Sequence, residues 1–188
     1  MTTYEGWHFL RTDRRLGYRD NRLAVVGETL TVSGPLVICK RGLHASARAL
    51  DALSYAPGPI ACRVQLSGTV LVGSDEHADK ACATERTVLA IVDASDVLRE
   101  FIRDTFIIRQ PHLVTLFELA GLVAVAQGLR ALAMDTAPLP DIERRCRAAA
   151  GTAAWTAAWD AAGDAAGDNL NARLESRLLA AVEDYSDE

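Results

Sequence analysis

The chain has 188 residues, of which 49% are hydrophobic and 24% charged, and its formal net charge is −5. This profile is typical of a globular protein with one domain and an appendage, and the negative balance argues against nucleic acid as a partner. The longest apolar stretch, residues 113–134, is interrupted by charged and amide side chains, which argues against a membrane span. No histidine stands at zinc-ligand spacing from the four cysteines, which argues against a metal site.

The first predicted element is a strand over residues 4–10 (YEGWHFL), which are aromatic and strand-like, and a basic, turn-rich loop follows. Short apolar runs within residues 23–42, punctuated by glycine and proline, predict a strand, a turn and a second strand. Ser46 is a candidate N-cap for a helix over about residues 47–55, which two nearby prolines would end.

Two further strands complete the N-terminal half. Residues 61–73 alternate between apolar and polar side chains, and Gly68 within them predicts a bulge. After a polar connection, the segment ERTVLAIV predicts a strand that begins at Glu85. Residues 1–94 are therefore expected to form a mixed, mostly antiparallel sheet of about five strands with one internal helix.

From Ser95 the pattern changes to helices. An amphipathic helix is expected from Ser95, and a second helix, apolar on nearly all sides and therefore buried, is expected to open at Pro111. A linker then leads to a terminal helix over residues 141–182, rich in alanine, glycine and tryptophan. The predicted fold class is α+β, with the sheet domain followed by a helical region over residues 95–188.

The terminal helix contains a short internal repeat, AAAG TAAW TAAW DAAG DAAG, in which a glycine or tryptophan recurs every fourth residue. On a helix this period makes one slowly drifting stripe of small residues, with Trp155 and Trp159 as large apolar anchors. One interpretation is packing inside the protein. The other is a partner-binding face centred on the two tryptophans, or a homodimer contact through residues 148–170.

The segment GLHAS is the clearest candidate for chemistry, because it stands at the expected junction of a strand and a helix. There, Gly42 lets a ligand approach the backbone, Ser46 lies at a helix N-terminus with free N–H groups, and His44 lies beside them. Tyr55 at the far end of the helix is a candidate stacking residue, and His8 on the first strand is expected to face the same cleft. The alternative is a plain turn with a structural histidine and a core tyrosine.

Glu85 is the candidate carboxylate. At the edge of a strand facing a pocket, it would orient a ribose hydroxyl or stabilise a developing positive charge. The alternative is an exposed charge at the end of a strand.

Residues 4–92 resemble an uncharacterised domain common in phage and prophage genomes. The segments that carry the resemblance are YEGW, GYRD, GETL, ICKRGLHAS, ALDALSYAPG and CRVQLSGTV. Members of that family often end in Ala/Trp-rich helices followed by an asparagine-containing segment, here NARLE at residues 171–175. The resemblance implies a phage-type origin.

A second resemblance links GLHASARALDALSYAPG and CRVQLSGTV to the ADP-ribosyltransferase core of the poly-ADP-ribose polymerase type, in which a Gly-x-Tyr-x-Ala element and a second tyrosine cradle nicotinamide. It implies that Gly42 holds the amide, that Tyr55 stacks and that Glu85 is catalytic, with NAD as cofactor. His44 stands at the first tyrosine position, and His8 is the one substitute for the histidine of that family's His-Gly-Ser motif.

Two functional hypotheses follow. The first is a phage-type accessory protein without a cofactor that binds a host protein, in counter-defence or host takeover; the stripe, the basic residues 1–70 and the acidic residues 141–188 support it. The alternative is a mono-ADP-ribosyltransferase or other NAD-handling enzyme.

Because no signal peptide is recognisable and the cysteines form no CxxC pair, we expect a cytoplasmic setting in the host bacterial cell.

Overall fold

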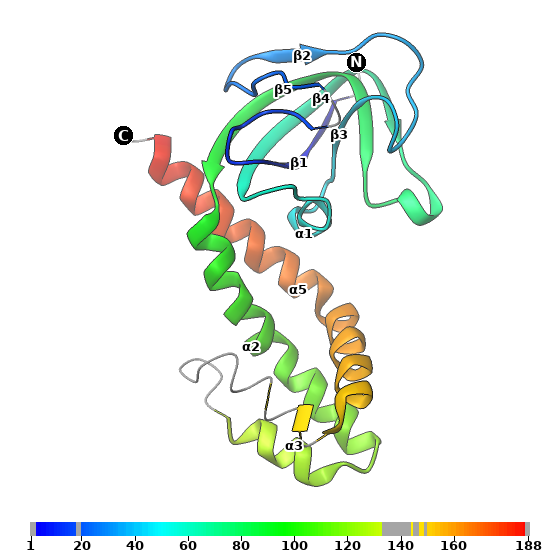
Figure 1. The fold of residues 1–188 in the computed structure, drawn as a ribbon, viewed down its shortest axis with the longest axis vertical. Helices are drawn as coiled ribbons and strands as arrows, with labels where there is room; N and C mark the ends of the chain where they lie inside the picture. The colour runs from blue at the N-terminus through cyan, green and yellow to red at the C-terminus, as the bar shows by residue number, and fades with distance from the viewer. Residues whose placement is uncertain (1–2, 18–19, 133–143, 145–146, 149, 187–188) are drawn as a thin grey trace. The chain divides into compact units, whose positions relative to one another are not determined.

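The computed structural model describes residues 3–17, 20–132, 144, 147–148 and 150–186. It confirms the predicted α+β class, because an antiparallel sheet of five strands with a short helix is followed by a helical half (Figure 1). The strands are β1 (Tyr4–Leu10), β2 (Thr29–Thr31), β3 (Leu43–Ala45), β4 (Ile60–Val72) and β5 (Ala81–Asp93). The helical elements are α1 (Ala49–Leu53), the 3-10 turn η1 (Asp75–His77), α2 (Ser95–Leu119), α3 (Val123–Arg130) and α5 (Thr152–Ser186).

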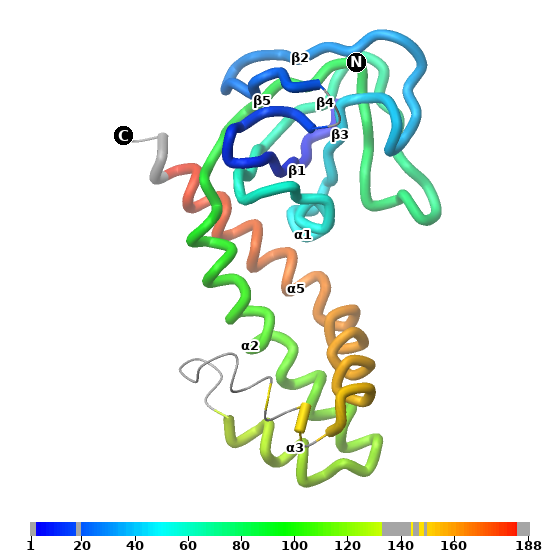
Figure 2. Tube along the Cα trace, in the orientation of Figure 1, coloured from blue at the N-terminus to red at the C-terminus, as the bar shows by residue number. Residues whose placement is uncertain are grey.

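The sheet is built around the long hairpin of β4 and β5, whose strands run side by side (Figure 2). Its strand order is β1-β4-β5-β2, with β3 also paired to β5, and every pairing between these strands is antiparallel. The alternation predicted for β4 is confirmed, since Cys62, Val64 and Leu66 are all buried. The predicted bulge is confirmed by a shift in the β4–β5 register around Gly68, which has a φ of +70°.

Two predicted strand boundaries are wrong. Within residues 23–42 the structure has only the three-residue strand β2, in which Leu30 is the one buried side chain. The rest of the segment consists of turns and irregular chain. β5 begins at Ala81, four residues before Glu85, so Glu85 lies inside the strand and not at its start. The small buried residues at the beginning of β5 carry little strand propensity, which concealed this part of the strand.

The predicted helix over residues 47–55 exists as the shorter α1, but Ser46 is not its N-cap. Arg48 takes that position without a side-chain capping bond. Ser46 instead pairs through its backbone with Trp7 of β1, with N–H to O distances of 2.7 and 3.0 Å between the two residues. This pairing needs a glycine at position 6, because a Cβ there would overlap the Ser46 carbonyl oxygen.

The core of the sheet unit lies between the sheet and the chain that connects β1 to β3. Leu16 and Ala24 of the connecting loop are buried against residues of β4 and β5, such as Leu66 and Val88. Burial of these aliphatic side chains fixes the connecting loop to the sheet, although the loop contains almost no regular structure.

The chain divides into two compact units. One comprises Met1–Leu98 together with Leu174–Glu188, and the other comprises Arg99–Arg173. In the first unit, the carboxylate of Glu175 accepts hydrogen bonds from the indole Nε1 of Trp7 (3.2 Å) and from the main-chain N–H of Ala49 (3.1 Å). Glu175 therefore supplies the acceptor at the start of α1 that had been expected from Ser46.

In the helical unit, the prediction that a helix opens at Pro111 is wrong. α2 continues through Pro111 to Leu119, and a turn separates it from α3. A proline inside a helix removes one hydrogen bond and costs about 3 kcal/mol. Apolar side chains on both sides of Pro111, Phe106 and Phe117, are buried in the same core, and their packing offsets this cost.

The tryptophan stripe of α5 packs inside the helical unit. Trp155 is 2% exposed, and its ring stacks on Phe117 with centroids 6.3 Å apart. Trp159 packs on Phe106, with centroids 4.6 Å apart, and its ring lies 4.2 Å from the guanidinium of Arg109. The stripe thus has the intramolecular packing of the first interpretation. The predicted start of this helix at residue 141 lies outside the described residues.

Candidate functional site

The segment around His44 is fixed by contacts within the protein. His44 Nε2 accepts a 3.0 Å hydrogen bond from the main-chain N–H of Cys39. Burial is the largest influence on the imidazole and lowers the pKa of His44, against a bond with the Gly42 carbonyl that raises it. Gly42 has a φ of +140°, and a Cβ there would lie 2.8 Å from Cβ of Cys82, so this glycine serves the close approach of the loop to β5.

Tyr55 is joined to the same loop through Lys80. The Tyr55 hydroxyl donates to Oδ2 of Asp79 at 2.6 Å, and Nζ of Lys80 lies 3.6 Å from the centre of the Tyr55 ring and 3.4 Å from Sγ of Cys39. Burial lowers the pKa of Lys80, but its contacts with Tyr55 and Cys39 and the charge of Asp79 together raise it by more. The net shift of the Lys80 pKa is therefore upward, and the ammonium stays charged. Tyr55 itself is 55% exposed and is not a core residue.

Glu85 lies apart from these groups. Its Oε2 accepts a 3.0 Å hydrogen bond from the Ser67 hydroxyl, and its side chain lies over Gly68. Within the described part of the chain, no hydrogen bond, ion pair or ring contact joins Glu85 to His44 or Tyr55. The predicted NAD-binding site therefore stays a prediction. In the structure His44, Tyr55 and Glu85 are bonded to three different residues, Cys39, Asp79 and Ser67 respectively.

His8 and His44 are brought together by a residue that sequence reasoning missed, Arg86. This arginine is only 2% exposed, and its Nη1 donates to the main-chain oxygen of His44 at 2.9 Å. Burial lowers the pKa of Arg86 to about 10 and that of His8 well below its usual range, and the charge of Arg86 lowers the His8 pKa further. The available signal was the alternation of β5, which places Arg86 on the same face as the buried Val88.

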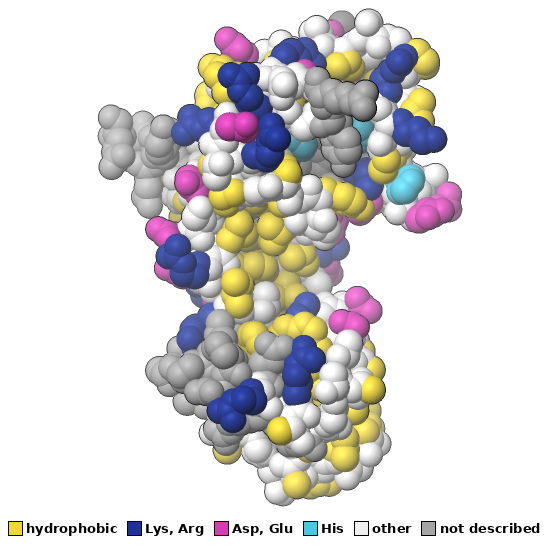
Figure 3. Space-filling model, in the orientation of Figure 1, with side chains coloured by type: hydrophobic (Ala, Val, Ile, Leu, Met, Phe, Trp, Pro, Cys, Tyr) yellow, Lys and Arg dark blue, Asp and Glu magenta, His cyan; other side chains and the backbone are white. Residues whose placement is uncertain are grey.

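A second arrangement, the loop face, is made by the loop after β1 and by β5. A shallow depression of about 270 Å³ is lined by Arg14, Leu23, Ala24, Val25, Val26 and Ile91. Three of these aliphatic side chains are exposed, Leu23 at 45%, Val25 at 37% and Val26 at 55%. Figure 3 shows lysine and arginine side chains interleaved with hydrophobic ones on the visible face of the sheet unit.

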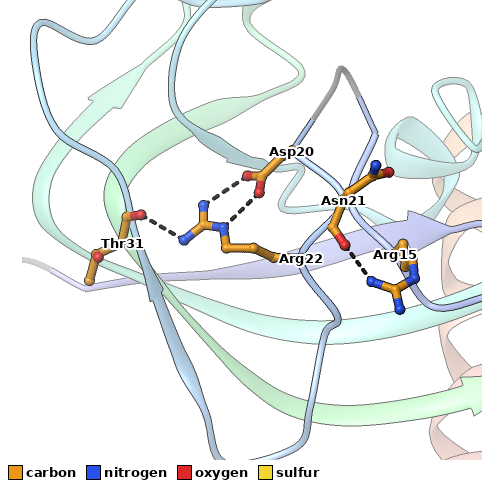
Figure 4. Close-up of polar contacts among 5 residues, drawn as sticks. All are labelled: Arg15, Asp20, Asn21, Arg22 and Thr31. Carbon is orange, nitrogen blue, oxygen red and sulfur yellow. Dashed lines mark hydrogen bonds and ion pairs between the residues drawn. The ribbon is translucent and has the colours of Figure 1, made fainter.

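The loop that carries this face is held by a network of polar contacts (Figure 4). The guanidinium of Arg22 binds both carboxylate oxygens of Asp20, at 2.6 and 2.8 Å, and donates to the main-chain oxygen of Thr31 at 2.8 Å. Arg15 donates to the main-chain oxygen of Asn21 at 2.7 Å. These bonds join described residues of the loop to one another and to β2.

No group of side chains in the described ranges has the composition and spacing to hold a metal ion. Likewise, none of the helices among those residues is long and apolar enough to span a bilayer.

A family model matches part of the chain. Neither a curated protein nor a solved structure matches the chain. The matched segment is Arg11 to Glu100, which includes the loop face, Arg86 and the predicted residues from Gly42 to Glu85, and excludes His8 and the tryptophan stripe. Residues 11–100 match a domain of unknown function, DUF7666.

Proposed function

We propose that this chain is a phage-type accessory protein that acts by binding a host protein, in counter-defence or host takeover. The observation that carries the proposal is the loop face, where exposed Leu23, Val25 and Val26 surround a depression beside Arg14. Single exposed aliphatic residues are common on soluble proteins, but a contiguous group around a depression is typical of interaction sites.

The contacts made by the described residues of the loop support this proposal. A loop that is ordered before binding loses little conformational entropy when a partner docks, so more of the contact energy appears as affinity. The Arg22–Asp20 pair and the buried Leu16 and Ala24 supply this order.

The chemistry of the loop face indicates the kind of partner. Its exposed side chains are aliphatic, and the charged side chain that lines it is the cation Arg14. An apolar segment with acidic residues at its edge complements such a surface, and the opposite charges raise the association rate. The proposed partner is therefore a host protein that presents an acidic and aliphatic segment.

The test compares capture from a host lysate by the full chain and by the double variant Leu23→Ser/Val26→Ser. A captured protein is then purified and titrated, and we expect the double variant to bind it about 10- to 100-fold more weakly. Val72→Ser is the matched control, because Val72 is 56% exposed and is not part of the loop face. Equal binding by wild type and double variant, equal loss in Val72→Ser, or no directly binding partner would overturn the proposal.

A further inference from the structure

Arg86 is a buried cation whose hydrogen bonding is incomplete. It lies opposite Leu66 in the β4–β5 pairing, and paired residues of antiparallel strands project to the same face, so its side chain enters the core beside β1. Its Nη1 has the His44 carbonyl oxygen as an acceptor, but its buried Nε–H has no acceptor in the structure. Leaving such a donor unpaired is costly, and more so when the group is charged.

The neighbouring carboxylate does not balance this charge. Asp20 attracts Arg86, but both oxygens of Asp20 are bound by the guanidinium of Arg22. Within the described residues, no carboxylate lies within ion-pair distance of Arg86. Among the described residues, the guanidinium of Arg22 therefore neutralises Asp20, the acidic group that lies near Arg86.

The remaining neighbours of Arg86 carry no negative charge at neutral pH. Burial lowers the pKa of His8 and of His44, so both imidazoles are neutral. Burial raises the pKa of the Cys62 thiol to about 12, so it stays protonated. Arg86, Arg22, Asp20, His8, His44 and Cys62 together thus carry a net positive charge; Arg86 and Cys62 are buried, whereas Arg22 and Asp20 are partly exposed.

We propose that Arg86 anchors an internal oxyanion-binding site, in which a carboxylate or phosphate oxygen accepts the unpaired Nε–H. Guanidinium groups bind these two anions through short, charge-assisted hydrogen bonds. His8 and His44 are half-buried, whereas Arg86 is almost fully buried. The neutral imidazole of His8 has one N–H group, which supplies a further donor to the anion, whereas both ring nitrogens of His44 are already bonded, to Cys39 and to Gly42.

The experiment follows the Arg86 Nε–H signal by NMR in the ¹⁵N-labelled full chain, with the signal assigned from its loss in Arg86→Met. Inorganic phosphate and acetate are titrated separately against sodium chloride of equal ionic strength, and the thermal midpoint is recorded in each series. We expect a saturable shift of this signal and a saturable rise in the midpoint. A response to phosphate alone indicates a phosphate-bearing ligand, and a response to acetate indicates a carboxylate.

Two variants make the result specific. In Arg86→Met, we expect the affinity for the active anion to fall about 10- to 100-fold, the loss of one charged hydrogen bond. Arg63→Met is the matched control, because Arg63 also lies in the sheet but is paired with Glu5, and it should bind the anion like wild type. If Arg86→Met does not fold, the Nε–H signal is assigned from its through-bond correlations to the Arg86 side-chain carbons in ¹³C,¹⁵N-labelled wild type, and its response decides alone. No saturable response to either anion, as expected if water fills the site, or an equal loss in Arg63→Met, would overturn the proposal.

Discussion

Glu175 accepts the main-chain N–H of Ala49, the first residue of α1, although the two residues are 126 positions apart in the chain. The same carboxylate oxygen accepts the indole N–H of Trp7. One side chain of α5 therefore secures both a helix start and a strand of the sheet unit.

The first prediction concerns this contact. We expect Glu175→Ala to lower the free energy of unfolding by about 1–3 kcal/mol, because it removes a helix-capping acceptor and leaves the buried Trp7 indole unpaired. Urea unfolding followed by circular dichroism measures this change. Glu183→Ala, at an exposed position of the same helix, should change stability by less than about 0.5 kcal/mol. Equal losses in the two variants would contradict the assigned role.

The second prediction separates core from interface in the tryptophan stripe. Because Trp155 is buried against Phe117, Trp155→Ala should cost about 3–5 kcal/mol and give a partly unfolded protein. Leu119→Ala, at a position 81% exposed, is the control and should have little effect. Thermal unfolding together with size-exclusion chromatography checks this. A Trp155→Ala protein of unchanged stability that loses dimerisation would instead favour the interface interpretation.

The third prediction is a loss of stability in acid. Burial is the largest cause that lowers the folded-state pKa of His8, while the unfolded chain has an ordinary histidine pKa near 6.5. The unfolded state therefore binds more protons below about pH 6.5, so stability is full above that pH and declines as the pH falls toward the folded-state value, by at most about 1.4 kcal/mol per pH unit for His8.

Urea unfolding at pH 7.5, 6 and 5 measures this effect. His8→Gln, which cannot be protonated, should lose less stability over this range than wild type. The residual loss in that variant would include a contribution from His44, whose pKa burial also lowers. Parallel pH profiles for wild type and His8→Gln would contradict the prediction.

The fourth prediction addresses the alternative enzyme hypothesis. Glu85 is bonded to Ser67 and shares no contact with His44 or Tyr55 in the described residues, so we expect the intact protein to leave NAD unconsumed. Release of nicotinamide measured by chromatography tests this directly. Glu85→Gln keeps an acceptor for Ser67 and should remain folded. NAD consumption by wild type that disappears in Glu85→Gln would establish the enzyme hypothesis instead.

The strands with local signals could be predicted from the sequence. β1 was predicted with its bounds from its aromatic, strand-like residues, and β4 with its bulge from side-chain alternation and a glycine within an apolar strand. The start of β5 could not be predicted in this way, because it is fixed by pairing with β3 and β4, which are distant in sequence.

The candidate site was less predictable for the same physical reason. His44 and Tyr55 were selected as ligand-binding residues, yet their partners are Cys39, Asp79 and Lys80, which only the folded chain brings near them. Arg86 was overlooked, since an arginine beside a glutamate in a strand looks like a solvent-exposed pair. The alternation of β5 places Arg86 on the same face as the buried Val88, but its burial also depends on the connecting loop, whose Leu16 and Ala24 belong to the same core.

The position of Glu175 also bears on how the protein folds during synthesis. The ribosome adds residues from the N-terminus, so β1, α1 and the β4–β5 hairpin emerge well before residue 175 is made. Until then the indole of Trp7 and the first N–H of α1 lack their acceptor. The sheet unit therefore reaches its final hydrogen bonding only once residue 175 has been added, after the intervening helical unit has been synthesised.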